Sequence, residues 1–125
     1  MKALVPAIVI AALAAGTAAY AGPAGAGDAN RGRTVFARCA ACHDASTGAN
    51  KSGPSLKGIV GRRAASAAGY NFSTGLKTKG GTWTRASLDA YIAGPARYAP
   101  GTRMVVSVTD PQQRADLVAY LATLR

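Results

Sequence analysis

Both cysteines and the only histidine of this 125-residue chain lie in one pentapeptide, CAACH at residues 39–43. So short a supply of Cys and His excludes a four-ligand Cys/His zinc site unless Asp or water completes it. The pentapeptide therefore constrains the chain more than any other feature, because all chemistry that needs a thiol or an imidazole must take place at this single turn.

The spacing of Cys39, Cys42 and His43 is the C-x-x-C-H signature of c-type haem attachment. Two thiols three residues apart at the end of a helix can add to the two vinyl groups on one edge of a porphyrin, and the imidazole of the next residue then lies below the iron. One covalently attached haem c is therefore the predicted cofactor. The alternatives are a thioredoxin-like redox pair, which needs a βαβ context that the sequence pattern lacks, and a structural disulfide with an incidental histidine.

An iron bound by His43 needs a ligand on its opposite face, and the chain holds no second histidine. Methionine is the next candidate. Met104 is the sole methionine once Met1 is removed, and it ends a turn-forming segment, residues 100–104. In the alternative, Met104 fills a gap in the core, the iron is five-coordinate or water-ligated, and gas binding or peroxidase chemistry is expected.

The first residues have the pattern of a secretory signal peptide. Met1 and Lys2 give a short positive start, and residues 3–15 are apolar without a charge. Small residues flank Tyr20, which predicts cleavage after Ala21. The alternative is an uncleaved membrane anchor, but a span needs about 20 apolar residues and this run is shorter.

The rest of the chain is too short for more than one domain. We expect a flexible segment at residues 22–27 and a single domain over residues 28–125. Export predicts a soluble bacterial protein of the periplasm. We also expect a monomer without stable membrane insertion.

Capping residues and apolar spacing predict where the helices begin. Asp28 can cap a helix that runs through Cys39, and Thr84 can cap a helix that ends at Gly94. Both helices carry apolar residues on one face at helical spacing.

A third helix is predicted at the C-terminus, where Asp110 is followed by Pro111 and by Gln113 in a capping-box position. Its apolar stripe continues to the end of the chain. Residues 43–82 show no lasting periodicity and are expected to form loops, with at most a short helix near residues 73–77.

Large side chains are scarce in this chain. Hydrophobic residues make up 49%, but aromatics make up only 6%, and 15 residues are glycine. A core of such side chains alone would be thin, and so long a loop region is unusual unless the loops wrap a bound object. We therefore predict an all-α domain of three to five helices whose long loops wrap around one covalently bound haem.

The charge is strongly basic, with 15 Lys and Arg against 5 acids, all of them Asp. Such a surface favours an anionic partner. Nucleic acid is not expected, because the chain carries no recognition motif and export separates it from nucleic acid.

Several segments then follow one another in a familiar order. They are GDANRG at residues 27–32, GPSL at 53–56, GR at 61–62, Trp83 with Tyr91 eight residues later, and PARYAPGTRM at 95–104. With the haem pentapeptide, they resemble class I cytochrome c, of the soluble mitochondrial and bacterial c2-like type, over nearly the whole predicted mature chain.

The resemblance implies a role for each matching residue. The Pro54 carbonyl would accept the Nδ1 proton of His43, Arg62 would neutralise a haem propionate, and Trp83 and Thr102 would also lie at the propionates. Tyr91 would donate a hydrogen bond to the methionine sulfur, and Phe36 would pack beneath the C-terminal helix with Tyr120 as its partner. The complete set of expected cofactor-binding residues is Cys39, Cys42, His43, Pro54, Arg62, Trp83, Tyr91, Thr102 and Met104, with His43 and Met104 as the metal ligands.

The chain also departs from the family. Phe72 stands where many members have a propionate-binding Tyr, and Leu76 where Asn often joins a polar network, so a drier site is expected. Arg97 and Arg103 replace lysines that are thought to become ligands at high pH in the family, and a guanidinium stays protonated there. The porphyrin faces are expected to contact Phe36, Leu56, Trp83, Leu88, Tyr91 and Leu117.

With both axial positions filled, substrate cannot coordinate the iron, and one-electron exchange remains. The sequence therefore predicts an electron carrier and not an enzyme, and the alternative is a gas sensor or peroxidase-like enzyme with labile Met104 ligation. Its expected partners are acidic docking faces of redox proteins: a quinol-oxidising cytochrome complex, an oxidase, a reaction centre or a dehydrogenase. Candidate docking residues are Arg38, Lys51, Arg97 and Arg103.

Overall fold

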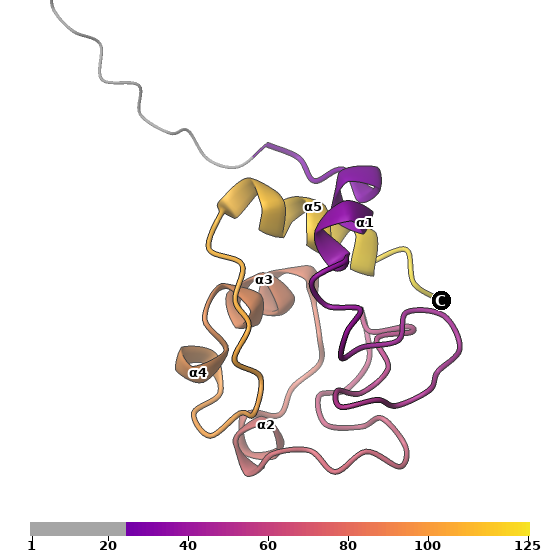
Figure 1. Cartoon of the computed structure of the whole chain (residues 1–125). Helices are drawn as coiled ribbons and strands as arrows, with labels where there is room; N and C mark the ends of the chain where they lie inside the picture. Colours follow the sequence, from indigo (N-terminus) through magenta and orange to yellow (C-terminus); the bar gives the residue numbers. More distant parts are fainter. Residues whose placement is uncertain (1–24) are drawn as a thin grey trace, which may run out of the picture.

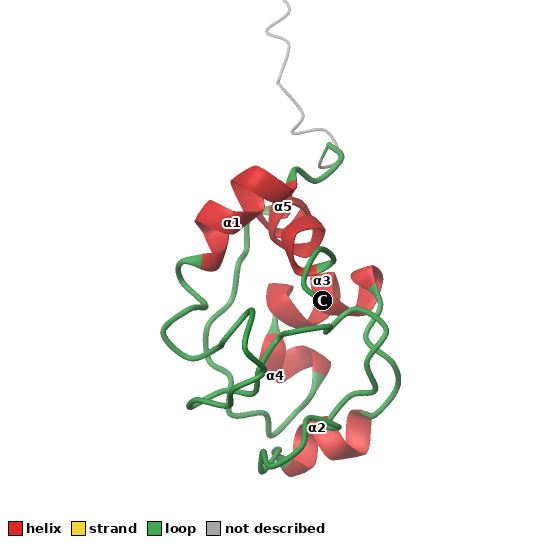
Figure 2. Ribbon diagram, turned by 90° about the vertical axis from the view of Figure 1, so that its right-hand side faces the viewer, coloured by secondary structure: helices red, strands yellow, loops and turns green. Residues whose placement is uncertain are grey.

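The structure is a computed structural model that describes residues 25–125, and these form five helices (Figure 1). The helices are α1 (Ala29–Phe36), α2 (Thr74–Lys79), α3 (Arg85–Ala93), α4 (Pro95–Tyr98) and α5 (Pro111–Leu121). Residues 25–125 contain no strand, only one isolated bridge between Arg63 and Thr82. The all-α class and the number of helices are therefore confirmed (Figure 2).

The two terminal helices cross at one end of the molecule, and α2 lies at the other end (Figure 1). Asp28 caps α1 as predicted, accepting a hydrogen bond from the Arg31 N–H at 2.8 Å. A Cβ atom at Gly32 would overlap the carbonyl oxygen of Asp116. The contact between α1 and α5 is thus a contact between backbones, which only glycine permits at this position.

Two helices end earlier than the sequence predicts. The helix from Asp28 was expected to reach Cys39, but α1 ends at Phe36, because the Cys39 N–H turns back to the Phe36 carbonyl at 2.7 Å. The last helix was expected to run to the C-terminus, but α5 ends at Leu121. The Thr123 N–H and hydroxyl both donate to the Tyr120 carbonyl, at 2.9 and 2.6 Å, which tightens the last turn.

The middle helices follow local capping signals. Thr84 and Ser87 form a capping box at the start of α3, and Gly94 ends that helix. The short helix α4 was not predicted; it begins directly at Pro95. Gln113 does not complete the expected capping box of α5; its side chain accepts a hydrogen bond from Arg38 at 3.0 Å instead.

The segment between α1 and α2 consists of loops that are tied to one another (Figure 2). The Asn50 amide donates to the Ala68 carbonyl at 2.9 Å, and the Tyr70 hydroxyl donates to the Ser52 carbonyl at 2.8 Å. Residues 50–52 and 68–70 therefore lie side by side without forming a sheet.

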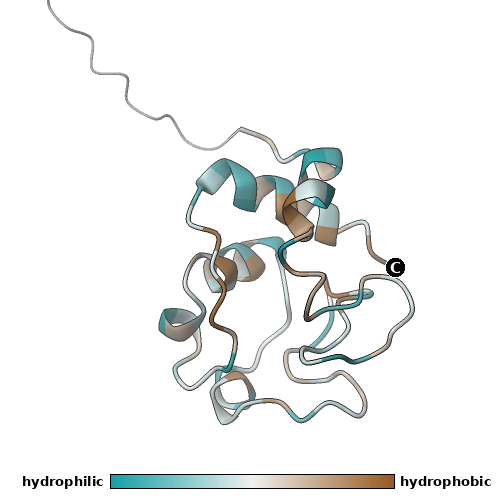
Figure 3. Ribbon diagram, in the orientation of Figure 1, coloured by the Kyte–Doolittle hydropathy of each residue, from teal (hydrophilic) through white to brown (hydrophobic). Residues whose placement is uncertain are grey.

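Hydrophobic residues of α3, of α5 and of the segment between α4 and α5 gather toward the middle of the molecule (Figure 3). Leu117 and Val108 are the most deeply buried large side chains. Phe36 was expected both beneath the C-terminal helix and against the porphyrin. Only the first position is found: its ring lies 5.3 Å from that of Tyr120, between α1 and α5, and Phe36 does not line the central cavity.

The predicted signal peptide, residues 1–21, lies outside the described residues. The segment 22–27 was expected to be flexible, but its described part, residues 25–27, lies against α5. The Gly25 N–H donates to the Gln112 side chain at 2.7 Å. Over residues 25–125, no helix is both long enough and apolar enough to cross a membrane.

One carboxylate links the two terminal helices. Asp116, which is only 4% exposed, accepts hydrogen bonds from the Asp28 N–H, from Arg31 Nε and Nη2 and from Gln112, at 2.8 to 3.1 Å. The hydrogen bond from Arg31 and those from the other donors lower the pKa of Asp116 from 3.8 to about 2. A carboxyl with a lowered pKa stabilises the fold above its unfolded pKa, and that contribution is lost as pH falls through the folded value.

We therefore expect Asp116→Asn to lower the free energy of unfolding at pH 7 and to remove part of its fall between about pH 4 and about pH 2. Urea unfolding across this pH range measures both effects. The matched control is Asp89→Asn, because Asp89 pairs with Arg114 at 2.9 Å but its side chain is 46% exposed. Equal losses in the two variants would contradict this role for Asp116.

Candidate functional site

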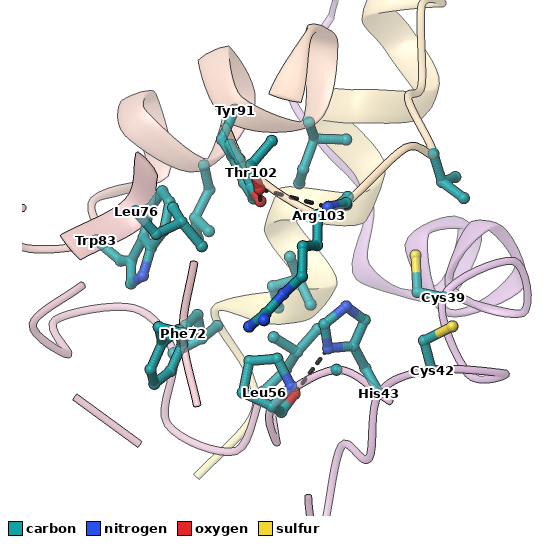
Figure 4. A pocket seen from close by; sticks show the side chains of 18 of the residues that line it. Cys39, Cys42, His43, Leu56, Phe72, Leu76, Trp83, Tyr91, Thr102 and Arg103 are labelled. Carbon is teal, nitrogen blue, oxygen red and sulfur yellow. Dashed lines mark hydrogen bonds between the residues drawn. The ribbon is translucent and has the colours of Figure 1, made fainter. Parts of the chain in front are cut away.

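The CAACH turn follows α1 directly and opens onto a cavity in the middle of the molecule. The Cys42 and His43 N–H groups both donate to the Cys39 carbonyl, at 3.0 and 2.9 Å. Both cysteines are free thiols, and their sulfur atoms lie at the edge of the cavity (Figure 4). Burial raises the pKa of the Cys39 thiol.

The imidazole of His43 is held on two sides. Its Nδ1 lies 2.7 Å from the Pro54 carbonyl oxygen, which can only accept, so Nδ1 carries the proton and Nε2 keeps its lone pair (Figure 4). A Cβ at Gly53 would come within 2.5 Å of the ring, so this glycine packs directly on the imidazole. Burial lowers the pKa of His43; the bond to Pro54 opposes this, and the charges of Lys51 and Arg62 add to it. A buried, neutral and oriented imidazole suits a metal ligand.

The cavity has a volume of about 290 Å³, close to the lower end of ligand pockets. All nine residues expected to bind the cofactor line it, although they come from segments far apart in the sequence. Of the six side chains expected against the porphyrin, Leu56, Trp83, Leu88, Tyr91 and Leu117 line it as well.

Trp83 and Tyr91 form an aromatic part of the cavity wall, and Tyr98 packs against both from outside the cavity. The Trp83 ring lies 5.3 Å from that of Tyr91 and 5.9 Å from that of Tyr98. The Tyr91 hydroxyl pairs with the Thr102 hydroxyl at 2.7 Å, whereas the resemblance implied the Met104 sulfur as its partner. Burial raises the pKa of Tyr91, and the bond to Thr102 opposes that rise.

Arg62 reaches the cavity from the loop that follows Ile59. Its guanidinium donates to the Ser55 and Lys57 carbonyls at 2.8 and 3.1 Å, which fixes the side chain in the wall. Burial lowers the pKa of Arg62. Phe72 is buried in the wall with its ring 4.8 Å from that of Tyr70.

Three of the four candidate docking residues lie at the cavity or at the CAACH turn, and Arg97 does not. Arg38 and Arg103 line the cavity, and Lys51 donates to the Ala40 carbonyl within the CAACH turn at 2.6 Å. Arg97 is exposed and does not line the cavity. Val105 and Val106, which line the cavity next to Arg103, are 91% and 45% exposed.

Sequence reasoning missed part of the wall. Ile59, Ile92 and Val108 are buried and line the cavity, and so does Tyr70. Ile92 lies on the buried face of α3, whereas Ile59 and Val108 lie outside the helices, in segments without helical spacing. No local signal could have identified them as cavity residues.

The donor set fits a covalently attached haem. Two unpaired thiols and an Nδ1-protonated imidazole occupy one turn, and they face an apolar cavity that also contains a thioether side chain, that of Met104. Thiols, imidazole and thioether are the groups by which proteins hold c-type haem. The fold and the site together define a protein of the c-type haem class.

Comparison with known proteins narrows this class to one family. The sequence model of the Cytochrome c family matches residues 29–125. A cytochrome c2 of Rhodomicrobium vannielii is 43% identical over 125 residues, covering 98% of this chain and 97% of the relative. A cytochrome c of Guizotia abyssinica is 45% identical over 99 residues, covering 77% of this chain and 89% of the relative.

The solved structure of cytochrome cH from Methylobacterium extorquens superposes with a TM-score of 0.73 at 45% identity, covering 78% of this chain and 99% of that one. The chain belongs to the cytochrome c family. Its function is therefore that of a single-haem electron carrier and not of an enzyme, its cofactor is covalently attached haem c, and it exchanges electrons with redox partners.

Proposed function

We propose that Cys39 and Cys42 would hold haem c through thioether bonds, and that His43 and Met104 would be the ligands of its iron. The observation that carries this proposal is the convergence of all nine expected site residues on one cavity. His43 is already oriented by Pro54, and Met104 approaches from a separate turn that is distant in the sequence.

The remaining site residues would control the environment of the haem. Arg62, Trp83 and Thr102 supply N–H and O–H donors for the propionates, and Pro54 fixes the His43 tautomer. Tyr91 holds Thr102 in place through the 2.7 Å bond between their hydroxyls. Phe72 and Leu76 add apolar wall where a polar side chain would admit water.

Bound haem c supplies one-electron exchange between ferric and ferrous iron. With His43 and Met104 both engaged, the chain offers no open position to a substrate or gas, which supports a carrier over a sensor or a peroxidase. A thioether ligand and an apolar wall both favour the reduced state, so the potential is expected to be positive.

Replacing Met104 with Ala tests this ligation. We expect the purified haem protein to keep a low-spin ferrous spectrum that carbon monoxide leaves unchanged. The Met104→Ala variant should bind carbon monoxide, and its midpoint potential should fall by on the order of 0.1 V, a fraction of the ~0.8 V that axial ligands span. Visible spectra with and without carbon monoxide, and a redox titration, measure this.

Two results would contradict it. Ready binding of carbon monoxide by the unaltered protein would mean a labile sixth position and would favour the sensor or peroxidase alternative. Absence of a Soret band after expression with a cytochrome c maturation system would end the haem assignment.

We also propose that acidic redox partners dock at the mouth of the cavity, on a surface formed by Arg38, Lys51, Arg103, Val105 and Val106. The first three carry positive charge beside the CAACH turn and the Met104 turn, and the two valines are exposed. Partners of this kind include a quinol-oxidising cytochrome complex, an oxidase, a reaction centre or a dehydrogenase. Positive charge raises the rate of encounter with such a partner more than the affinity.

Charge reversal at the docking surface should slow electron transfer. We expect Arg38→Glu to lower the second-order rate with an acidic redox partner about three- to tenfold at low ionic strength, with the effect shrinking as salt shortens the Debye length to ~3 Å at 1 M. Arg85→Glu is the matched control, because Arg85 is exposed on α3 and does not line the cavity. Stopped-flow kinetics measure both variants, and equal losses would mean that only net charge matters.

We propose finally that the chain is exported to the periplasm and cleaved after Ala21. The charge and apolar pattern of residues 1–21 supports this. Intact mass and N-terminal sequencing of the periplasmic fraction should give a chain that begins at Gly22 and carries one haem. A membrane-bound chain that retains Met1 or Lys2 would show an uncleaved anchor instead.

A further inference from the structure

The short helix α2 lies directly against the turn that leads into Met104. A Cβ atom at Gly75 would overlap the Pro100 carbonyl oxygen, and it would lie 2.9 Å from Thr102 N and 3.0 Å from the Gly101 carbonyl carbon. These neighbours are all backbone atoms, so no side chain can rotate away to make room. Only a glycine at position 75 allows α2 to come this close.

Two further contacts join α2 to the same segment. Three residues before the helix begins, the Arg103 guanidinium donates to the Asn71 carbonyl. At its C-terminal end, Lys79 Nζ lies 4.6 Å from the centre of the Tyr98 ring. A surface groove is lined by residues of α2 and by Pro100 and Gly101, outside the central cavity. The first turn and the last residue of α2, and Asn71 ahead of the helix, therefore contact residues 98–103, and Figure 1 shows α2 beside this part of the chain.

The turn itself has little internal support. Within it, the Thr102 N–H donates to the Ala99 carbonyl at 2.9 Å and the Met104 N–H donates to the Thr102 hydroxyl at 3.4 Å, and Gly101 has a φ of +88°. From outside the turn, the Tyr91 hydroxyl of α3 pairs with the Thr102 hydroxyl at 2.7 Å. Met104, two residues further on, is followed by Val105, which is 91% exposed. A segment with so few buried contacts takes its position from what it packs against.

We propose that Gly75 is a positioning residue for Met104: the close approach of α2 at Gly75 keeps the 100–104 turn against the cavity and so keeps Met104 at the haem. The proposal rests on Met104 being an axial ligand, as proposed above. Gly75 does not line the cavity and acts only through the turn. The helix α2 thus helps to keep Met104 on the iron, so that no other ligand can bind there.

The test is Gly75→Ala in the haem-loaded protein. The added methyl group must push α2 and the turn apart, which raises the fraction of molecules with Met104 released. Carbon monoxide binds the ferrous protein only in that fraction, so its apparent affinity should rise about tenfold, and the sulfur-to-iron charge-transfer band of the ferric protein should weaken. A change in helix propensity cannot explain a release of Met104 in this variant, because Ala is a better helix former than Gly.

Gly27→Ala is the matched control. Its Cβ would overlap the Ala115 carbonyl oxygen just as closely, but ahead of α1 and against α5, and Gly27 does not line the cavity. We expect it to lower the free energy of unfolding while leaving carbon monoxide affinity within about twofold of the parent. Equal gains in affinity in both variants, or none in Gly75→Ala, would overturn the proposal. Ready carbon monoxide binding by the parent would instead refute Met104 ligation itself.

A measurement on the unaltered haem protein decides the question if Gly75→Ala does not fold. The Gly80 amide, bonded to Leu76 at 3.0 Å, reports on α2, and the Thr102 amide reports on the turn. Hydrogen exchange of the two amides should follow one common opening, with the same rate and the same urea dependence. Protection of Thr102 that persists at least about tenfold longer than that of Gly80 would show that the turn stays closed without α2 and would overturn the proposal.

Discussion

The close contact between α1 and α5 determines where the haem attachment turn lies. Gly32 allows the two backbones to touch at Asp116, and the buried carboxylate of that residue holds the Asp28 N–H and the Arg31 guanidinium. Because α1 ends at Phe36, only three residues before the first thiol, the position of this helix fixes the CAACH turn. The same α5 contributes Leu117 to the cavity wall, so one helix contact positions both the turn and the wall it faces.

The loops between α1 and α2 are stabilised by the cavity and its cofactor, and not by a contact between helices. These loops have no regular ladder of backbone hydrogen bonds. Instead, single carbonyl groups accept hydrogen bonds near the site: the Cys42 carbonyl accepts from the Gly53 N–H at 2.8 Å, and the Pro54 carbonyl accepts from His43. Their apolar residues, such as Leu56 and Ile59, turn toward the cavity. Haem c supplies the apolar surface that these side chains would otherwise lack, so the cofactor is a part of the hydrophobic core as well as the redox group.

The sequence predicted those features of the fold that depend on residues close together in the chain. Asp28 and Thr84 were found as caps because capping joins atoms within one turn of a helix. The nine expected cavity residues follow from motif order, and they do meet at one site. What failed depends on distant partners: Gln113 was taken for a capping residue and pairs with Arg38, 75 positions away. Phe36 was expected both against Tyr120 and at the porphyrin, and only the contact with Tyr120 is found, because an apolar face in the sequence does not say how many neighbours it covers.

The mouth of the cavity combines charge with little apolar area, and this suits a carrier that must leave its partner. Binding energy grows with the apolar surface that is buried, whereas long-range attraction raises the encounter rate and weakens as salt increases. At the proposed docking surface only Val105 and Val106 are large exposed hydrophobic residues, and charged side chains lie beside them. Arg38 and Lys51 are also hydrogen bonded, to Gln113 and to the CAACH turn. Their charges therefore stay at fixed positions beside the thiols, where they can orient an acidic partner toward the haem without holding it tightly.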